Sequence, residues 1–121
     1  MIDVTRPIGV LALAVFNFVS DEDDPVAIIQ QLRRLVPTGS LLAFSHGARP
    51  DVDPTADSVE RVYQRASGQA VLRTRAELTQ LLKDCELLPP GLVHASQWTA
   101  DPTQPLPGAG TTMTLAAVVA L

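Results

Sequence analysis

The chain has 121 residues, of which 46% are hydrophobic and 18% are charged, with a formal net charge of -4. This length and composition are typical of one globular domain and exclude a disordered chain. The acidic balance, with basic residues scattered along the chain, argues against a nucleic-acid partner. A single cysteine, Cys85, excludes an internal disulfide and a cysteine-based metal cluster.

The longest apolar run, residues 8–19, is shorter than the roughly 20 residues that a membrane-spanning helix needs. The chain opens with no basic segment followed by a cleavage site, so no secretory signal is expected. We therefore predict a cytoplasmic protein without a membrane partner.

The first third of the chain predicts a strand, a helix and a second strand. Residues 8–19 are apolar without alternation, which is typical of a strand buried on both faces of a parallel sheet. Asp24 and Pro25 then predict a helix start, with Asp24 capping free backbone N–H groups. A Pro-Thr-Gly turn ends the helix, and residues 40–45 form the next strand. This unit predicts a right-handed crossover between two parallel strands.

The rest of the chain predicts two helices and two strands. Asp53 and Pro54 open a second helix, with Tyr63 on its apolar face. Thr74 and Glu77 form a capping box for a third helix, which runs to about Cys85. Residues 92–99 and 113–121 are expected to pair as an antiparallel hairpin. The fold class is therefore α/β, with the order β-α-β-α-α-β-β.

Several stretches carry a resemblance to a known family: FNFVSDEDDPVAII, SHG, VYQRA, LRTRAEL and LLPPGLVHASQW. Together with the element order, they resemble the C-terminal half of a class I, S-adenosylmethionine-dependent methyltransferase with a Rossmann-like fold. More narrowly, they resemble a bacterial S-adenosyl methyltransferase family of undefined substrate. The resemblance implies S-adenosylmethionine as cofactor and a small molecule as methyl acceptor.

The chain departs from the family pattern in two ways. The family usually has His-Phe-Val-Pro-Asp where this chain has residues 17–21, so Asn17 replaces a histidine. In the family a Gly-rich loop after the first strand and an acid after the second hold the cofactor. Gly9 lies inside a strand with no G-x-G nearby, and the nearest acid before it, Asp3, precedes the strand. We therefore expect residues 1–121 to form a single but incomplete domain that does not bind the cofactor alone.

Ligands of an open α/β sheet bind beyond the carboxyl ends of its strands, which points to the ends of the two parallel strands. Phe16, Asn17 and Asp21 are the predicted cofactor contacts. His46 is the predicted catalytic base, whereas Ser45 and Tyr63 are predicted to contact the substrate.

Each prediction has a structural alternative. Asn17 is equally suited to satisfying backbone groups at the strand end, and a lone strand-end histidine such as His46 is often structural. For Asp21 the favoured explanation is a solvated residue before the helix, and for Tyr63 it is a core residue. Two histidines and no carboxylate at ligand spacing predict no metal site.

Two kinds of function remain open. In the first, the chain is part of a methyltransferase whose missing N-terminal half pairs with residues 8–19. In the second, it is a non-catalytic module that forms a homodimer, or docks on a partner, through the same strand. An apolar strand without Lys or Pro at a sheet edge is prone to pair with another chain. This property is expected for both functions, because each requires a partner at residues 8–19.

Overall fold

The computed structural model describes residues 1–49, 70–101, 103–104, 108 and 113–121. The described elements are β1 (Gly9–Leu13), α1 (Pro25–Leu35), β2 (Leu41–Gly47), α3 (Arg75–Leu81), β3 (Glu86–Leu87), β4 (Val93–His94) and β5 (Thr114–Ala120). Short 3₁₀ helices occupy Phe16–Phe18, Asp21–Asp23 and Ala95–Gln97. The predicted second helix, with Tyr63, lies outside the described residues.

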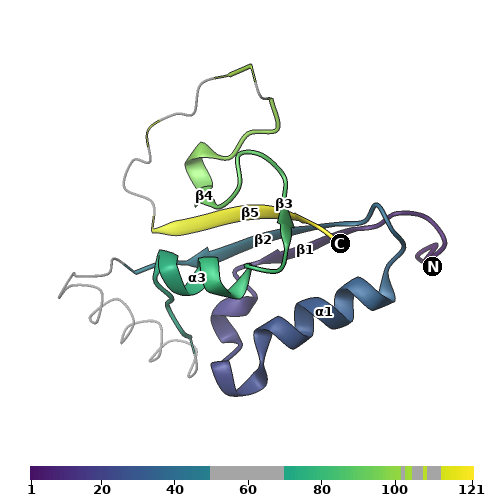
Figure 1. Cartoon of the computed structure of the whole chain (residues 1–121), viewed down its shortest axis with the longest axis horizontal. Coiled ribbons are helices and arrows are strands. Elements are labelled where there is room, and N and C mark those ends of the chain that lie inside the picture. The colour runs from purple at the N-terminus through teal and green to yellow at the C-terminus, as the bar shows by residue number, and fades with distance from the viewer. Residues whose placement is uncertain (50–69, 102, 105–107, 109–112) are drawn as a thin grey trace.

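The described strands form one five-stranded sheet in the order β1-β2-β5-β3, and β4 also pairs with β5 (Figure 1). β1 and β2 run parallel, with Gly9 opposite Leu41 and Leu13 opposite Ser45. β5 runs antiparallel to β2, β3 and β4. The predicted α/β class and the parallel pair are confirmed.

Local sequence signals explain how both described α-helices begin. The Asp24 carboxylate accepts a hydrogen bond from the N–H of Ala27 at 3.1 Å, and Pro25 occupies the first turn of α1. At α3, the Thr74 hydroxyl accepts from the N–H of Glu77, while the Glu77 carboxylate accepts from the N–H of Thr74. Both predicted helix starts are therefore confirmed.

The predicted strand over residues 8–19 is wrong in its extent, because β1 ends at Leu13. Ala14 adopts the left-handed conformation with φ 58, which is uncommon for a residue with a side chain. Its N–H is held by the carbonyl oxygen of Ser45 at 3.1 Å and by the Ser45 hydroxyl at 3.0 Å. The chain therefore leaves the sheet at Ala14 and turns into the 3₁₀ helix Phe16–Phe18.

Other predicted boundaries are also corrected. α3 ends at Leu81 rather than near Cys85, because Cys85 donates its N–H to Leu82 in a turn. The strand predicted over residues 92–99 is reduced to Val93–His94, and the 3₁₀ helix Ala95–Gln97 follows it. β3 is a strand of two residues that the sequence analysis did not predict.

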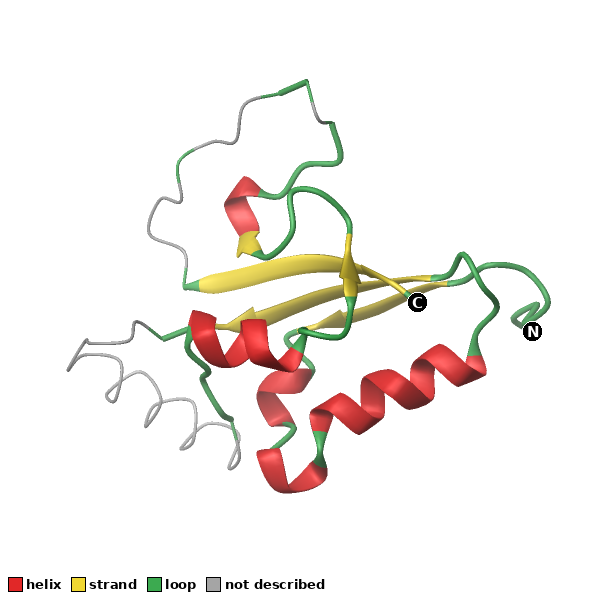
Figure 2. Cartoon of the chain, viewed as in Figure 1, coloured by secondary structure: helices red, strands yellow, loops and turns green. Residues whose placement is uncertain are grey.

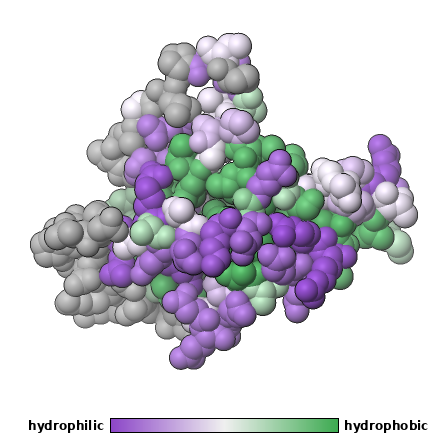
Figure 3. All heavy atoms as spheres, in the orientation of Figure 1, coloured by the Kyte–Doolittle hydropathy of each residue, from purple (hydrophilic) through white to green (hydrophobic). Residues whose placement is uncertain are grey.

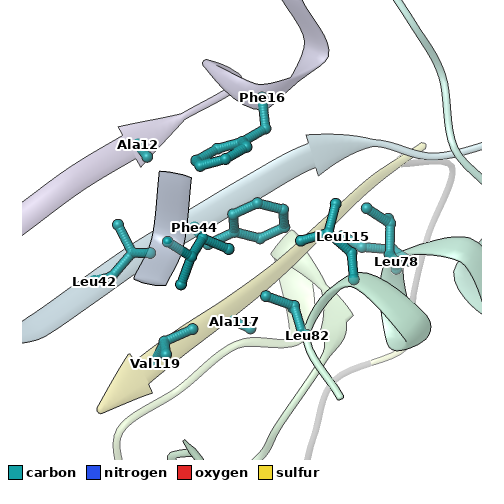
Figure 4. Close-up of a cluster of buried hydrophobic side chains, with 11 residues drawn as sticks. Ala12, Phe16, Leu42, Phe44, Leu78, Leu82, Leu115, Ala117 and Val119 are labelled. Atoms are coloured by element: carbon teal, nitrogen blue, oxygen red, sulfur yellow. The ribbon is translucent and has the colours of Figure 1, made fainter. Parts of the chain in front are cut away.

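One face of the sheet packs against α1 and α3, which lie on the same side of it (Figure 2). The core on this face joins side chains from β1, β2, β5 and both helices (Figure 4). The rings of Phe16 and Phe44 lie at its centre with centroids 5.4 Å apart. Leu42, Leu78 and Val119 are fully buried beside them.

On the opposite face of the sheet the side chains of β1 are exposed within the described chain, which corrects the prediction that the first strand is buried on both faces. Leu11 is 72% exposed and Leu13 57% exposed on β1, and the neighbouring Leu41 of β2 is 38% exposed. Hydrophobic residues reach the surface in the region of the sheet (Figure 3). We call Leu11, Leu13 and Leu41 the open apolar face.

Candidate functional site

The carboxyl ends of β1 and β2 meet a third segment, Val71 to Arg73, at one edge of the fold. Gly47 and Arg49 are joined to Arg73 by backbone hydrogen bonds, Arg73 N–H to Gly47 O at 3.4 Å and Arg49 N–H to Arg73 O at 3.1 Å. The N–H of Val71 donates to the carbonyl of Asn17 at 2.6 Å. These bonds bring the residues after β1, the end of β2 and the residues before α3 into one cluster.

Asn17 fastens the segment after β1 to the end of β2. Its side chain is buried, and its Oδ1 accepts the N–H of Gly47 at 3.0 Å. A Cβ atom added at Gly47 would lie 2.7 Å from Leu72 Cδ2 and 3.2 Å from Asn17 Nδ2, so a larger residue here would displace the Leu72 side chain. The contacts favour the structural alternative for Asn17, and its cofactor contact stays a prediction.

Arg73 is the residue that the sequence analysis missed. Its side chain is 4% exposed, and each terminal nitrogen makes two contacts. Nη1 lies 3.1 Å from the carbonyl oxygen of Phe16 and 2.8 Å from His46 Nε2. Nη2 donates to the carbonyl of Val19 at 2.7 Å and to the Asp21 carboxylate at 2.8 Å. Its only sequence signal is an arginine directly before the helix cap, within the stretch LRTRAEL.

His46 is fully buried, and both nitrogens of its ring are engaged. Nδ1 lies 2.7 Å from the carbonyl oxygen of Gly47, while Nε2 faces Arg73. A guanidinium only donates, so Nε2 is the acceptor and Nδ1 carries the proton. Burial, together with the positive charge of Arg73, lowers the pKa of His46 below its ordinary value. These contacts favour the structural alternative, and a base at His46 stays a prediction.

The remaining predicted site residues lie in different environments. Phe16 is 2% exposed and packs in the core, whereas the side chain of Asp21 is 89% exposed beside Arg73. Ser45 lies on the opposite face of β2 from His46, because side chains alternate along a strand. The structure therefore does not bring Ser45 and His46 together on one face, and Tyr63 is outside the described residues.

A cavity of about 950 Å³ opens beside this cluster, between the start of α1, the segment Val71 to Arg73, and α3. Its charged lining side chains are Asp21, Asp24, Arg49, Arg73, Glu77, Lys83 and Asp84. Arg49 and Glu77 form an ion pair across 3.7 Å. Asp21, one of the predicted cofactor contacts, lines this cavity beside Arg73, so we take it as the candidate functional site.

A second hollow of about 490 Å³ lies away from the predicted site. It is lined mainly by apolar side chains, among them Leu88, Pro89, Pro90 and Trp98. None of the predicted site residues in the described part of the chain lines it.

A family model described as S-adenosyl methyltransferase matches residues 1–121. Among solved structures, the chain is 31% identical to a DUF574 family protein from Streptomyces avermitilis MA-4680, with a TM-score of 0.79 over 98% of this chain and 46% of that one. It is 22% identical to a protein from Thermobifida fusca YX described as a candidate methyltransferase, with a TM-score of 0.78 over 99% of this chain and 45% of that one. No curated protein matches.

A more distant structure shares the fold at 18% identity: CalO1, a methyltransferase in calicheamicin biosynthesis, in its SAH-bound form. Its TM-score is 0.55, and the match covers 92% of this chain and 29% of that one. The chain thus spans less than half the length of the solved structures it matches. No helix among the described residues is long and apolar enough to cross a membrane. With the family match over its whole length and the shared fold, the chain belongs to the S-adenosyl methyltransferase family.

Proposed function

We propose that this chain is the C-terminal part of an S-adenosylmethionine-dependent methyltransferase that acts on a small molecule, and that it does not bind the cofactor alone. One observation carries the second claim. Of the three predicted cofactor contacts, Phe16 and Asn17 turn buried side chains into the protein, and only Asp21 offers an exposed one. The described residues alone therefore do not fit the cofactor, and we derive no methyl-transfer step from them.

The open apolar face supports the same proposal. In an α/β sheet of this class both faces are covered by helices, whereas α1 and α3 cover only one face here. β1 also pairs only with β2 among the described strands, which leaves its other edge available. We propose that the part of the fold present in the longer relatives pairs with this edge and covers Leu11 and Leu13.

The cavity supports a small-molecule acceptor. Its volume of about 950 Å³ lies within the range of small-molecule sites, and its lining includes Asp21 and Arg49, which follow β1 and β2 in the chain. The proposed acceptor site is this cavity, which Ser45 does not line. An acceptor contact at Ser45 or Tyr63 stays a prediction. His46 is retained as proposed base only where a movement of Arg73 frees its Nε2.

Calorimetry with SAH tests the proposal directly. Titration of the purified chain with SAH to millimolar concentration is expected to give no binding heat, with CalO1 as the positive control because its structure holds SAH. Binding of SAH to the chain at a ratio of one to one would refute the claim that the chain needs a further part.

The open apolar face also favours the second candidate function, a module that forms a homodimer or docks on a partner through β1. In that case sedimentation of the chain alone gives a stable species of twice the 12.9 kDa mass. A monomer at high concentration excludes the homodimer and leaves pairing with a separate partner.

A further inference from the structure

Arg73 is itself held rigidly, which is what a residue that orients others requires. Its backbone forms a parallel bridge to the end of β2, through Gly47 and Arg49. The next residue, Thr74, caps α3 in the capping box. The backbone of Arg73 is therefore fixed from both sides, by the sheet and by a helix start.

The guanidinium of Arg73 supplies three hydrogen bonds to the segment from Phe16 to Asp21, in addition to the backbone bonds that Phe16 O accepts from Val19 and Asn17 O accepts from Val71. The segment is not part of the sheet, so its carbonyl groups have no strand partner. The carbonyls of Phe16 and Val19 both accept from Arg73, and the carboxylate of Asp21 completes the set. The Arg73 side chain thus contacts three residues of this six-residue segment, although it lies 52 to 57 residues further along the chain.

We propose that Arg73 is the positioning residue of the candidate site: it holds Phe16, Asn17 and Asp21 in place and presents a cationic donor to Nε2 of His46. The idea that this segment faces the cofactor rests on the proposed function. The hydrogen bonds of Arg73 are observed independently of that proposal. An arginine is required because its planar fork donates in several fixed directions, whereas a lysine ammonium is a single point.

Two substitutions separate the two parts of this role. Arg73→Lys keeps the positive charge and loses the fork, so we expect the segment to loosen while His46 still faces a cation. Arg73→Met keeps the length and loses the charge as well. The matched controls are Arg75→Lys and Arg75→Met, because Arg75 lies two residues away and makes one backbone contact, to the Leu92 carbonyl at 2.8 Å.

NMR of the isotope-labelled full chain supplies three readouts. In the wild type, the proton of neutral His46 is expected on Nδ1. In Arg73→Lys, hydrogen exchange of the Val19 amide, which is bonded to Phe16 O, is expected to accelerate about tenfold or more relative to Arg75→Lys. In Arg73→Met, the titration midpoint of His46 is expected to move upward relative to Arg75→Met, because the cation 2.8 Å from Nε2 is removed. The other charge near the imidazole is Glu77 of α3, which both variants retain.

The proposal is overturned by a proton on Nε2 in the wild type. It is equally overturned by Val19 exchange that is as slow in Arg73→Lys as in its control, or by a His46 midpoint that stays in place in Arg73→Met. If both Arg73 variants fail to fold, the wild-type tautomer alone decides. Because no cofactor is used, SAH binding to the chain would refute the proposed function and leave these results standing.

Discussion

The open apolar face can be tested by truncating the same residue type on the two faces of the sheet. Leu11 of β1 is 72% exposed, and Leu42 of the neighbouring strand β2 is 0% exposed. Leu42→Ala removes fully buried methyl groups from the core, and such changes cost about 2–5 kcal/mol. Leu11→Ala removes atoms that already contact water, so its cost should stay within about 0.5 kcal/mol.

Urea unfolding followed by circular dichroism measures both effects. With a slope of about 1–3 kcal/mol per molar, a loss of about 3 kcal/mol lowers the midpoint for Leu42→Ala by about 1–3 M. The midpoint for Leu11→Ala should coincide with that of the wild type. The measurement is repeated at several protein concentrations, because the stability of an obligate dimer depends on concentration.

A large loss in Leu11→Ala would refute the reasoning, since it would mean that Leu11 is covered in the isolated chain. If that loss also depended on protein concentration, Leu11 would be covered by a second copy of the chain. A homodimer would then be favoured over pairing with a separate partner. Leu11→Lys then tests the pairing itself, because a charge on this face should prevent association without unfolding the chain.

Three further predictions concern the cluster at the end of β2. Gly47→Ala should cost about 1–3 kcal/mol in urea unfolding, because the added Cβ overlaps Leu72, whereas Gly9→Ala, which meets nothing within 4 Å, should not show this overpacking loss. Asn17→Ala should cost about 1–3 kcal/mol and speed amide exchange at Gly47, whose buried N–H loses its acceptor; unchanged exchange would count against the bond. Folding lowers the pKa of His46, so between about pH 7 and pH 5 the unfolded chain binds a proton at His46 more readily than the folded chain does. The free energy of unfolding should therefore fall as the pH drops through this range, and this part of the fall should be absent in His46→Gln.

Local signals predicted the parts of the fold that depend on neighbouring residues. Asp24 with Pro25, and Thr74 with Glu77, mark their helix starts because capping is a contact within one turn. The end of β1 could not be predicted in this way. Phe16 is buried whether the chain continues as a strand or turns into a 3₁₀ helix, and the turn is held by Ser45, a residue distant in sequence. An apolar run therefore indicates burial and leaves the backbone path open.

The sequence predicted a ligand site at the carboxyl ends of the parallel strands, which stays a prediction, and it gave no indication of Arg73. The position followed from the rule that ligands bind at the carboxyl ends of parallel strands. Arg73 was missed because its main acceptors are the backbone carbonyls of Phe16 and Val19, and a carbonyl carries no sequence signal. His46 and Asn17 have the same limitation, since Gly47 supplies the backbone group that each one binds.

The position of β5 in the sheet has a consequence for how the chain is made. β5 pairs residues 114–120 with residues 41–47 of β2, and it also holds β3 and β4. β5 is the last of the described elements to leave the ribosome, so β2 lacks its antiparallel neighbour until residues 114–120 have been synthesised. Pairings between such distant segments form slowly, and unpaired apolar strands aggregate. Until β5 is released, the nascent chain should therefore depend on chaperones, and a stop codon before residue 114 should leave a product that cannot join the two sides of its sheet.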